Sequence, residues 1–157
     1  MTVVSNTSPL NYLILIGHAD ILSKLYGTVA IPHAVLDELT AASTRRSVRE
    51  WAVNQPAWLS VQRPADLVDS ELEQIQIGER QAILLAKEIR PDFIILDDRK
   101  ARLLAEHQGL SVIGTLGVLT SAAEQGFMSL REALEELKRT NFRVSPGLLE
   151  SLANRSR

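Results

Sequence analysis

The sequence contains no cysteine, which excludes a disulfide scaffold, a thiolate zinc site and catalysis by a cysteine nucleophile. Aromatic residues make up only 4% of its 157 residues, so we expect an aliphatic core. Long apolar runs are also missing: the run over residues 12–16 is too short to span a bilayer and has no basic leader before it. We therefore expect a cytoplasmic protein without an export signal or a membrane segment.

The net charge of −2 does not point to nucleic acid in the way that a strongly basic domain would. Arginine nevertheless accounts for 13 of the 17 basic residues, and arginine suits bidentate contacts to phosphate. Two clusters stand out along the chain: Arg45, Arg46 and Arg49, then Arg99, Lys100 and Arg102. We regard Arg45, Arg46, Arg99 and Arg102 as candidate contacts to a nucleic acid. Solvated helix faces with ion pairs explain either cluster at least as well.

Short apolar runs alternate with longer helical patterns from one end of the chain to the other. Runs typical of strands lie at residues 3–4, 28–31, 59–62, 93–96 and 111–113. Helical patterns cover residues 9–15, 21–25, 45–53, 79–87, 100–108, 116–125 and 130–139, another begins at Pro32, and Ser145-Pro146 opens a short last helix. This alternation predicts one α/β domain over residues 1–157, with a parallel sheet covered by helices on both faces.

Two local signals refine this prediction. Ser8 is expected to cap the first helix, with Pro9 at its first helical position. The polar, acidic stretch at residues 63–78 contains Pro64 and predicts a mobile connection.

In an open parallel sheet, ligands bind beyond the carboxyl ends of the strands. The residues at these positions are Ser5, Asn6, Thr7 and Ser8 after the first strand, Asp97 and Asp98 after the fourth, and Gly114 and Thr115 after the last. Adjacent aspartates repel each other unless a cation or hydrogen-bond donors lie nearby. Strand alternation sends Asp97 and Asp98 to opposite sides, which favours one functional residue and one helix cap; capping alone explains Asp98 equally well.

Two glutamates occupy similar positions on expected helices. Glu38 lies beside the buried stripe of its helix, and Glu79 lies at a helix start, where the helix dipole favours a carboxylate. Taken singly, each is better explained by a structural or surface role. Function is indicated by the acidic positions together, because a cluster of carboxylates at one sheet edge suits Mg²⁺ or Mn²⁺. Such ions activate water and stabilise the charge that develops on a phosphodiester.

Five sequence motifs, in their order and spacing, resemble those of the PIN-domain family. They are residues 3–10 with Asn6, residues 31–39 with Glu38, residues 78–86 with Glu79, residues 95–102 with Asp97 and Asp98, and residues 113–117 with Thr115. The resemblance covers the chain from residue 3 to about residue 143. It is closest to small prokaryotic PIN proteins similar to VapC-like toxins, which are the toxin components of toxin–antitoxin pairs.

The resemblance implies a Mg²⁺- or Mn²⁺-dependent endoribonuclease with a three-layer α/β/α fold around a five-stranded parallel sheet. It assigns catalytic roles to Asn6, Glu38, Glu79, Asp97 and Asp98, and metal binding to the first four of these. It also assigns supporting roles to Thr7, Ser8 and Thr115, with Thr7 or Ser8 donating a hydrogen bond to the first position. Proteins of this kind often dimerise and are inhibited by a small antitoxin in the catalytic groove, so RNA, an antitoxin and a second copy are the expected partners.

One residue departs from the family pattern, because Asn6 stands where the pattern has aspartate. An amide oxygen can still ligate a metal, but one negative charge is lost. We therefore expect weakened metal binding and low activity. A second hypothesis follows from the same residue: a catalytically silent PIN domain that binds RNA or an antitoxin.

Other readings of the sequence are weaker. A receiver-type signalling domain would use Asp97 and Asp98 to hold Mg²⁺ for phosphorylation, but receiver domains place their acidic pair after the first strand. The histidines are too far apart in the sequence to suggest a zinc site. Trp51 and Trp58 are expected to be packing residues rather than platforms for base stacking.

Overall fold

A computed structural model of the chain describes residues 1–65 and 68–143. The strands are β1 (Thr2–Ser5), β2 (Thr28–Pro32), β3 (Leu59–Gln62), β4 (Phe93–Ile95) and β5 (Val112–Ile113). The helices are α1 (Thr7–Leu15), α2 (Ile21–Tyr26), α3 (His33–Leu39), α4 (Arg46–Val53), the 3₁₀ helix η1 (Leu72–Gln74), α5 (Ile77–Ile89), α6 (Arg99–His107), α7 (Thr115–Glu124) and α8 (Leu130–Lys138). The helix expected after Ser145-Pro146 lies outside the described residues. Within the described ranges, no helix combines the length and apolar content needed to cross a membrane.

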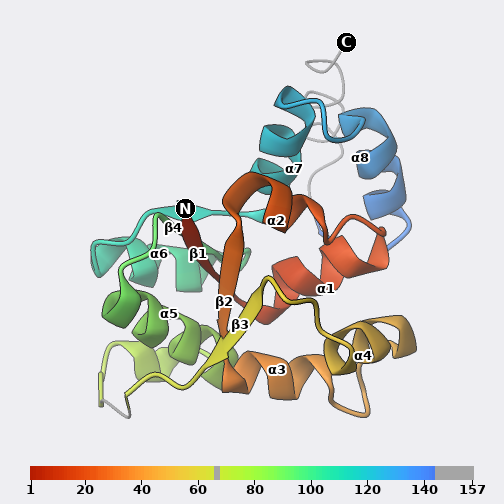
Figure 1. Cartoon of the computed structure of the whole chain (residues 1–157). Helices are drawn as coiled ribbons and strands as arrows, with labels where there is room; N and C mark the ends of the chain where they lie inside the picture. The colour runs from red at the N-terminus through yellow and green to blue at the C-terminus, as the bar shows by residue number, and fades with distance from the viewer. Residues whose placement is uncertain (66–67, 144–157) are drawn as a thin grey trace.

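All five strands pair in parallel in the order β3-β2-β1-β4-β5, which confirms the predicted α/β class (Figure 1). The chain builds outward from β1 through β2 to β3, then crosses to the other side of β1 to add β4 and β5. The strand order therefore reverses between β1 and β4. Ligands of open parallel sheets bind at such a switch point, beyond the carboxyl ends of the strands.

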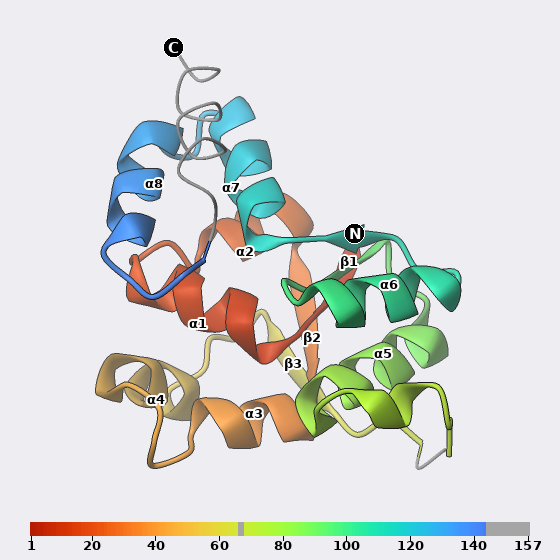
Figure 2. The ribbon, with the colours of Figure 1, turned by 180° about the vertical axis from the view of Figure 1, so that it is seen from behind.

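Helices cover both faces of the sheet, as the continuous apolar runs predict. Along β1, Val3 packs into one core cluster and Val4 into the other, because successive side chains of a strand point to opposite faces. In β4, Ile94 and Ile95 divide in the same way, and all four side chains are fully buried. Helices α5 and α6 lie on one side of the strands, and α1, α2, α7 and α8 lie on the other (Figures 1 and 2).

The first helix begins earlier than expected. Asn6, and not Ser8, is the residue that precedes it, with extended dihedral angles φ −84° and ψ 177°. Its backbone N–H donates to the carbonyl of Ile95 at 3.1 Å, so the pairing with β4 ends where the helix begins. Pro9 then falls within the first turn, where its missing N–H leaves no intrahelical hydrogen bond unmade.

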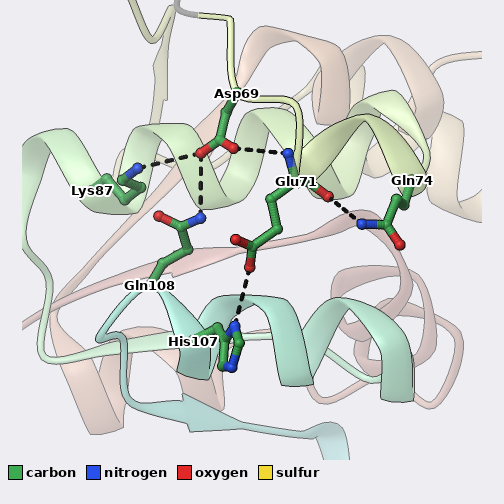
Figure 3. A network of polar contacts seen from close by, with 6 residues as sticks. All are labelled: Asp69, Glu71, Gln74, Lys87, His107 and Gln108. Atoms are coloured by element: carbon green, nitrogen blue, oxygen red, sulfur yellow. Dashed lines mark hydrogen bonds and ion pairs between the residues drawn. The ribbon is translucent and has the colours of Figure 1, made fainter.

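Within the connection expected over residues 63–78, residues 69–78 hold more structure than the local composition indicates. They contain η1, and a polar network joins them to α5 and the end of α6 (Figure 3). Asp69 accepts hydrogen bonds from Gln108 at 3.3 Å and from the backbone of Glu71 at 3.1 Å, and it pairs with Lys87 at 3.5 Å. Glu71 lies 3.3 Å from Nδ1 of His107. Local composition could not reveal these contacts, because most of the partners lie on later helices.

The two tryptophans have the packing role expected of them. Their ring centroids lie 5.9 Å apart at an interplanar angle of 55°. Both rings pack against the core cluster on the α1 face of the sheet. Trp51 and Trp58 therefore fix the connection from α4 to β3.

Candidate active site

The positions indicated by the sequence motifs lie after different strands, at the edge of the sheet where the strand order reverses. Asn6 directly follows β1, Glu38 lies in the helix after β2, and Glu79 lies in the first turn of α5. Asp97 and Asp98 lie between β4 and α6. Because the strands are parallel, their carboxyl ends all lie at the same edge of the sheet, and these positions lie near that edge.

Glu38 is half-buried between the starts of two other helices. The hydroxyl of Thr7, the first residue of α1, donates a hydrogen bond to its Oε2 atom. Thr7 was expected to support Asn6, so the structure gives this hydroxyl a different partner. Gly78 of α5 lies against the same carboxylate: a Cβ atom there would come within 2.8 Å of the Glu38 Cδ atom. The absence of a side chain at position 78 thus makes room for the Glu38 carboxylate.

Glu79 lies among other carboxylates at the N-terminus of α5. Burial raises its pKa, and the negative charges of Asp98 and Glu38 raise it further. A hydrogen bond from the backbone of Gln76 acts in the opposite direction, as expected for a glutamate three residues after the helix cap. The helix-capping explanation of Glu79 therefore holds, but it is incomplete. The charges of Asp98 and Glu38 therefore add to burial in disfavouring the ionised form of Glu79.

Asp97 and Asp98 divide their roles as the strand alternation predicts. Asp98 caps α6, where its Oδ2 atom accepts a hydrogen bond from the backbone of Ala101 at 3.0 Å. Asp97 is half-buried and held by Thr115, which donates from its backbone N–H at 2.8 Å and from its hydroxyl at 2.6 Å. Burial raises the pKa of Asp97, while the bonds from Thr115 and the positive charge of Arg102 oppose that rise. The supporting role expected of Thr115 is therefore directed at Asp97.

Asn6 has an unsatisfied buried oxygen. The residue is 5% exposed, and among the described residues its Oδ1 atom has no hydrogen-bond partner. Its side chain does not cap α1 either. A buried acceptor without a partner costs about 1–3 kcal/mol, so this oxygen is available to a ligand at little further cost.

A cleft of about 700 Å³ opens beside Asp97. Its walls include Ser8, Asp98 and Arg102, which the sequence motifs indicate, and Gly114 and Gly117 at the start of α7. Tyr12 and residues 141–143 also line it, although no sequence signal pointed to them. They meet because the Tyr12 hydroxyl donates to Oδ1 of Asn141 at 2.8 Å, a contact across 129 positions of sequence.

Only one of the four candidate RNA-binding arginines lines this cleft. Arg102 is held in place by its Nη1 atom, which donates to the carbonyl of Leu96 at 3.1 Å. Arg99 is exposed at the start of α6. Arg45 and Arg46 lie at the start of α4, which is well separated from α6 in both views (Figures 1 and 2). Arg46 pairs there with Glu50 at 2.8 Å in an exposed ion pair.

The donor set of this site fits a hard divalent cation. Carboxylate and amide oxygens are the ligands that Mg²⁺ and Mn²⁺ prefer, and Asn6 presents a buried oxygen without a partner. Burial raises the pKa of Glu79 most, and a cation would offset the negative charges of Asp98 and Glu38 that raise it further. Within residues 1–65 and 68–143, no three histidine, aspartate or glutamate side chains are grouped closely enough to hold a metal ion as they stand.

Comparison with known families agrees with this geometry. The family model described as a PIN domain matches residues 2–156. The chain therefore belongs to the PIN-domain family, whose members are commonly nucleases and generally use divalent metals. Comparisons with curated proteins and with solved structures gave no match.

Proposed function

We propose that this protein is an endoribonuclease that hydrolyses RNA phosphodiesters with Mg²⁺ or Mn²⁺. The observation that supports this most strongly is the buried, unpartnered oxygen of Asn6 at the edge of the sheet where the segments with Glu38, Glu79 and Asp97 also lie. Carboxylates are costly to bring together at a half-buried site without a cation. Their position at the switch point of a parallel sheet is where a substrate would bind.

In this proposal Asn6, Glu38, Glu79 and Asp97 hold the cation, with Asp98 as a near-equivalent of Asp97. A bound cation would activate a water molecule and stabilise the charge that develops on the phosphodiester. The side chains that orient these ligands are already hydrogen-bonded to them. Thr7 fixes Glu38, and Thr115 fixes Asp97 through both of its carboxylate oxygens.

We further propose that Asn6 attenuates this activity. An aspartate at position 6 would add one negative charge to the donor set, and charge count is a main determinant of affinity for hard cations. The amide supplies an oxygen but no charge. The chain as it stands should therefore bind Mn²⁺ weakly and cleave RNA slowly.

The proposal includes a biological role as the toxin of a toxin–antitoxin pair in the cytoplasm. It rests on the likeness of the motifs to VapC-like proteins. A small antitoxin would occupy the cleft beside Asp97, and a second copy of the chain would form a dimer. The open cleft, with Asp97 and Arg102 in its walls, offers charges of both signs to such a partner.

A catalytically silent PIN domain is the alternative, and Asn6 is also the residue that favours it. A domain that binds RNA or an antitoxin without cleaving RNA does not need a negative charge at position 6. This alternative predicts that RNA binds without being cleaved, even when the charge at position 6 is restored.

Calorimetry with Mn²⁺ on the full chain and on Asn6→Asp distinguishes the two functions. Asn54→Asp is the matched control, because it makes the same change at an exposed position at the end of α4. The nuclease proposal predicts tighter Mn²⁺ binding and EDTA-sensitive cleavage of a mixed single-stranded RNA pool by Asn6→Asp alone. RNA binding without cleavage, and no gain in Mn²⁺ affinity, would favour the silent module.

A further inference from the structure

Two aromatic rings that are far apart in the sequence meet at the wall of the cleft. Tyr12 lies in α1 and Phe142 follows α8, and their ring centroids are 4.9 Å apart at an interplanar angle of 84°. Both side chains are half-buried and line the cleft beside Asp97. The hydrogen bond from Tyr12 to Asn141 holds the two segments together. The pair is therefore a fixed apolar surface that faces an open, polar space.

Two arginines line the cleft together with this aromatic pair. Arg143 follows Phe142 directly and is exposed; its charge acts on the Tyr12 hydroxyl. Arg102 lines the same cleft, where its charge acts on Asp97, and it is fixed by the carbonyl of Leu96. Neither arginine forms an ion pair within the described part of the chain. Both guanidinium groups are thus available to an anionic ligand that enters the cleft.

We propose that Tyr12, Phe142, Arg102 and Arg143 form a subsite for single-stranded RNA, in which an unpaired base stacks on the aromatic pair and the arginines bind the flanking phosphates. The subsite rests on the proposed nuclease function and identifies how that site would hold its substrate. It gives the cleft wall a role that the acidic residues cannot have, because carboxylates repel phosphate.

Single-stranded RNA fits this arrangement better than a duplex. Bases in a duplex are already stacked on their neighbours, whereas unpaired bases stack readily on aromatic side chains. Arginine is suited to the phosphates because its planar guanidinium binds two oxygens at once. The tryptophans do not offer a comparable platform, since neither Trp51 nor Trp58 lines the cleft.

Binding of short oligonucleotides in EDTA tests the subsite without any cleavage. The probes are a fluorescent single-stranded RNA hexamer of uridine and a hexamer with the same backbone but no bases. The variants are Phe142→Leu and Arg143→Gln in the full chain. Phe127→Leu and Arg139→Gln are the matched controls, because neither residue lines the cleft: Phe127 packs near Lys24, and Arg139 pairs with Glu136.

Base stacking predicts that Phe142→Leu weakens binding of the uridine hexamer by about tenfold and leaves binding of the abasic hexamer unchanged. Phosphate contact predicts that Arg143→Gln weakens both probes similarly and reduces the slope of log K against log salt by about 0.7. Phe142→Tyr keeps the ring and should bind like the unmodified protein. Thermal unfolding identifies any variant that does not fold, and Arg143→Gln, at an exposed position, then still tests the phosphate contact.

Equal affinities across the variants and controls would overturn the subsite, as would equal losses for both probes in Phe142→Leu. No measurable binding of the uridine hexamer to the unmodified chain would overturn it too. The nuclease function is tested separately by cleavage in Asn6→Asp. If Asn6→Asp cleaves RNA but the subsite variants bind the hexamers as the unmodified protein does, the subsite is rejected and the nuclease function is kept. Base-dependent binding without cleavage would keep the subsite and reject the nuclease.

Discussion

The hydroxyl of Thr7 donates a hydrogen bond to Glu38, and this contact links the start of α1 to the helix that follows β2. Strands β1 and β2 are neighbours in the sheet, so the segments that follow them are held close together. Gly78 of α5 leaves space on the other side of the Glu38 carboxylate. Glu38 is therefore oriented by two elements that have no local sequence relationship to it.

Replacing Thr7 with valine should weaken the site more than the fold. The valine side chain has nearly the same shape but cannot donate to Glu38, so the carboxylate loses its orientation. Loss of such an orienting hydrogen bond typically costs about 10- to 100-fold in metal affinity or activity. Calorimetry with Mn²⁺ in the Asn6→Asp background measures the effect. Thr7→Ser should restore the affinity, and Thr40→Val, at an exposed threonine after α3, should leave it unchanged.

Gly78→Ala should displace Glu38 with little effect on stability. The new Cβ atom would meet the end of the flexible Glu38 side chain, which can move away. Alanine also favours the helix by about 0.5–1 kcal/mol relative to glycine, which offsets lost contacts. We expect a free energy of unfolding within about 1 kcal/mol of the unmodified value. Mn²⁺ affinity should fall at least tenfold in the Asn6→Asp background.

Gly17→Ala is the control for Gly78→Ala, because it should lower stability without affecting the site. Gly17 has φ +77° with open space around it, so alanine there adds backbone strain but no clash. It should cost about 1–2 kcal/mol of stability and leave Mn²⁺ affinity unchanged. If both glycine variants lost metal affinity in proportion to stability, position 78 would have no specific role at the site.

Much of the fold could be predicted because its signals are local. The strand expected at residues 59–62 is β3 itself, and the apolar run at residues 93–96 contains β4. Both strands follow from short apolar runs bounded by turn residues, and such a pattern can be recognised within a few neighbouring residues. The cap at Asp98 could be predicted for the same reason, since it depends only on the three residues that follow it.

The partners of the site residues could not be predicted, because packing over long sequence distances decides them. The family resemblance implies that Thr7 or Ser8 supports Asn6, but the Thr7 hydroxyl donates to Glu38, 31 positions away. Tyr12 belongs to an apolar run in the sequence, yet its hydroxyl donates to Asn141 across 129 positions. The periodicity of a helix indicates which face is buried, but it does not indicate which residue of another element lies against that face.

Thr115→Val should destabilise the protein in a way that depends on pH. The variant keeps the backbone hydrogen bond to Asp97 and loses the one from the hydroxyl. Burial already raises the folded pKa of Asp97, and the lost bond would raise it further. Ionised Asp97 is therefore destabilised most at neutral pH, where the cost should be about 1.5–3 kcal/mol, and less in acid, where Asp97 is protonated.

Urea denaturation from about pH 4 to about pH 7 measures this difference, a range that covers the titration of a carboxyl group whose pKa is raised. Thr120→Val is the control in the same helix, since its hydroxyl donates to the neutral carbonyl of Leu116. That variant should lose only about 0.5–1.5 kcal/mol, with no dependence on pH. If Thr115→Val lost the same free energy of unfolding at every pH in this range, the hydroxyl would not favour the ionised form of Asp97.

Glu79→Gln should make the metal-free protein more stable at neutral pH. Burial and the charges of Asp98 and Glu38 raise the folded pKa of Glu79 above its unfolded value, so the folded chain holds this proton more tightly. As the pH rises between these two values, the unfolded chain releases the proton first and the free energy of unfolding falls. Glutamine has no proton to lose, so the variant should gain stability relative to the unmodified protein as the pH rises through this range.

If Glu79 is a metal ligand, saturating Mn²⁺ should make the protein with Glu79 more stable than Glu79→Gln. A cation that binds only the folded state adds stability by mass action, and at 100 times its dissociation constant the gain is about 2.7 kcal/mol. Glu79→Gln would lose most of that gain, because the amide supplies no charge to the cation. Glu88→Gln, at an exposed position of the same helix, controls for the change in net charge. If Mn²⁺ stabilised both variants equally in the Asn6→Asp background, Glu79 would be only a helix-terminal carboxylate and the cation would have to bind without it.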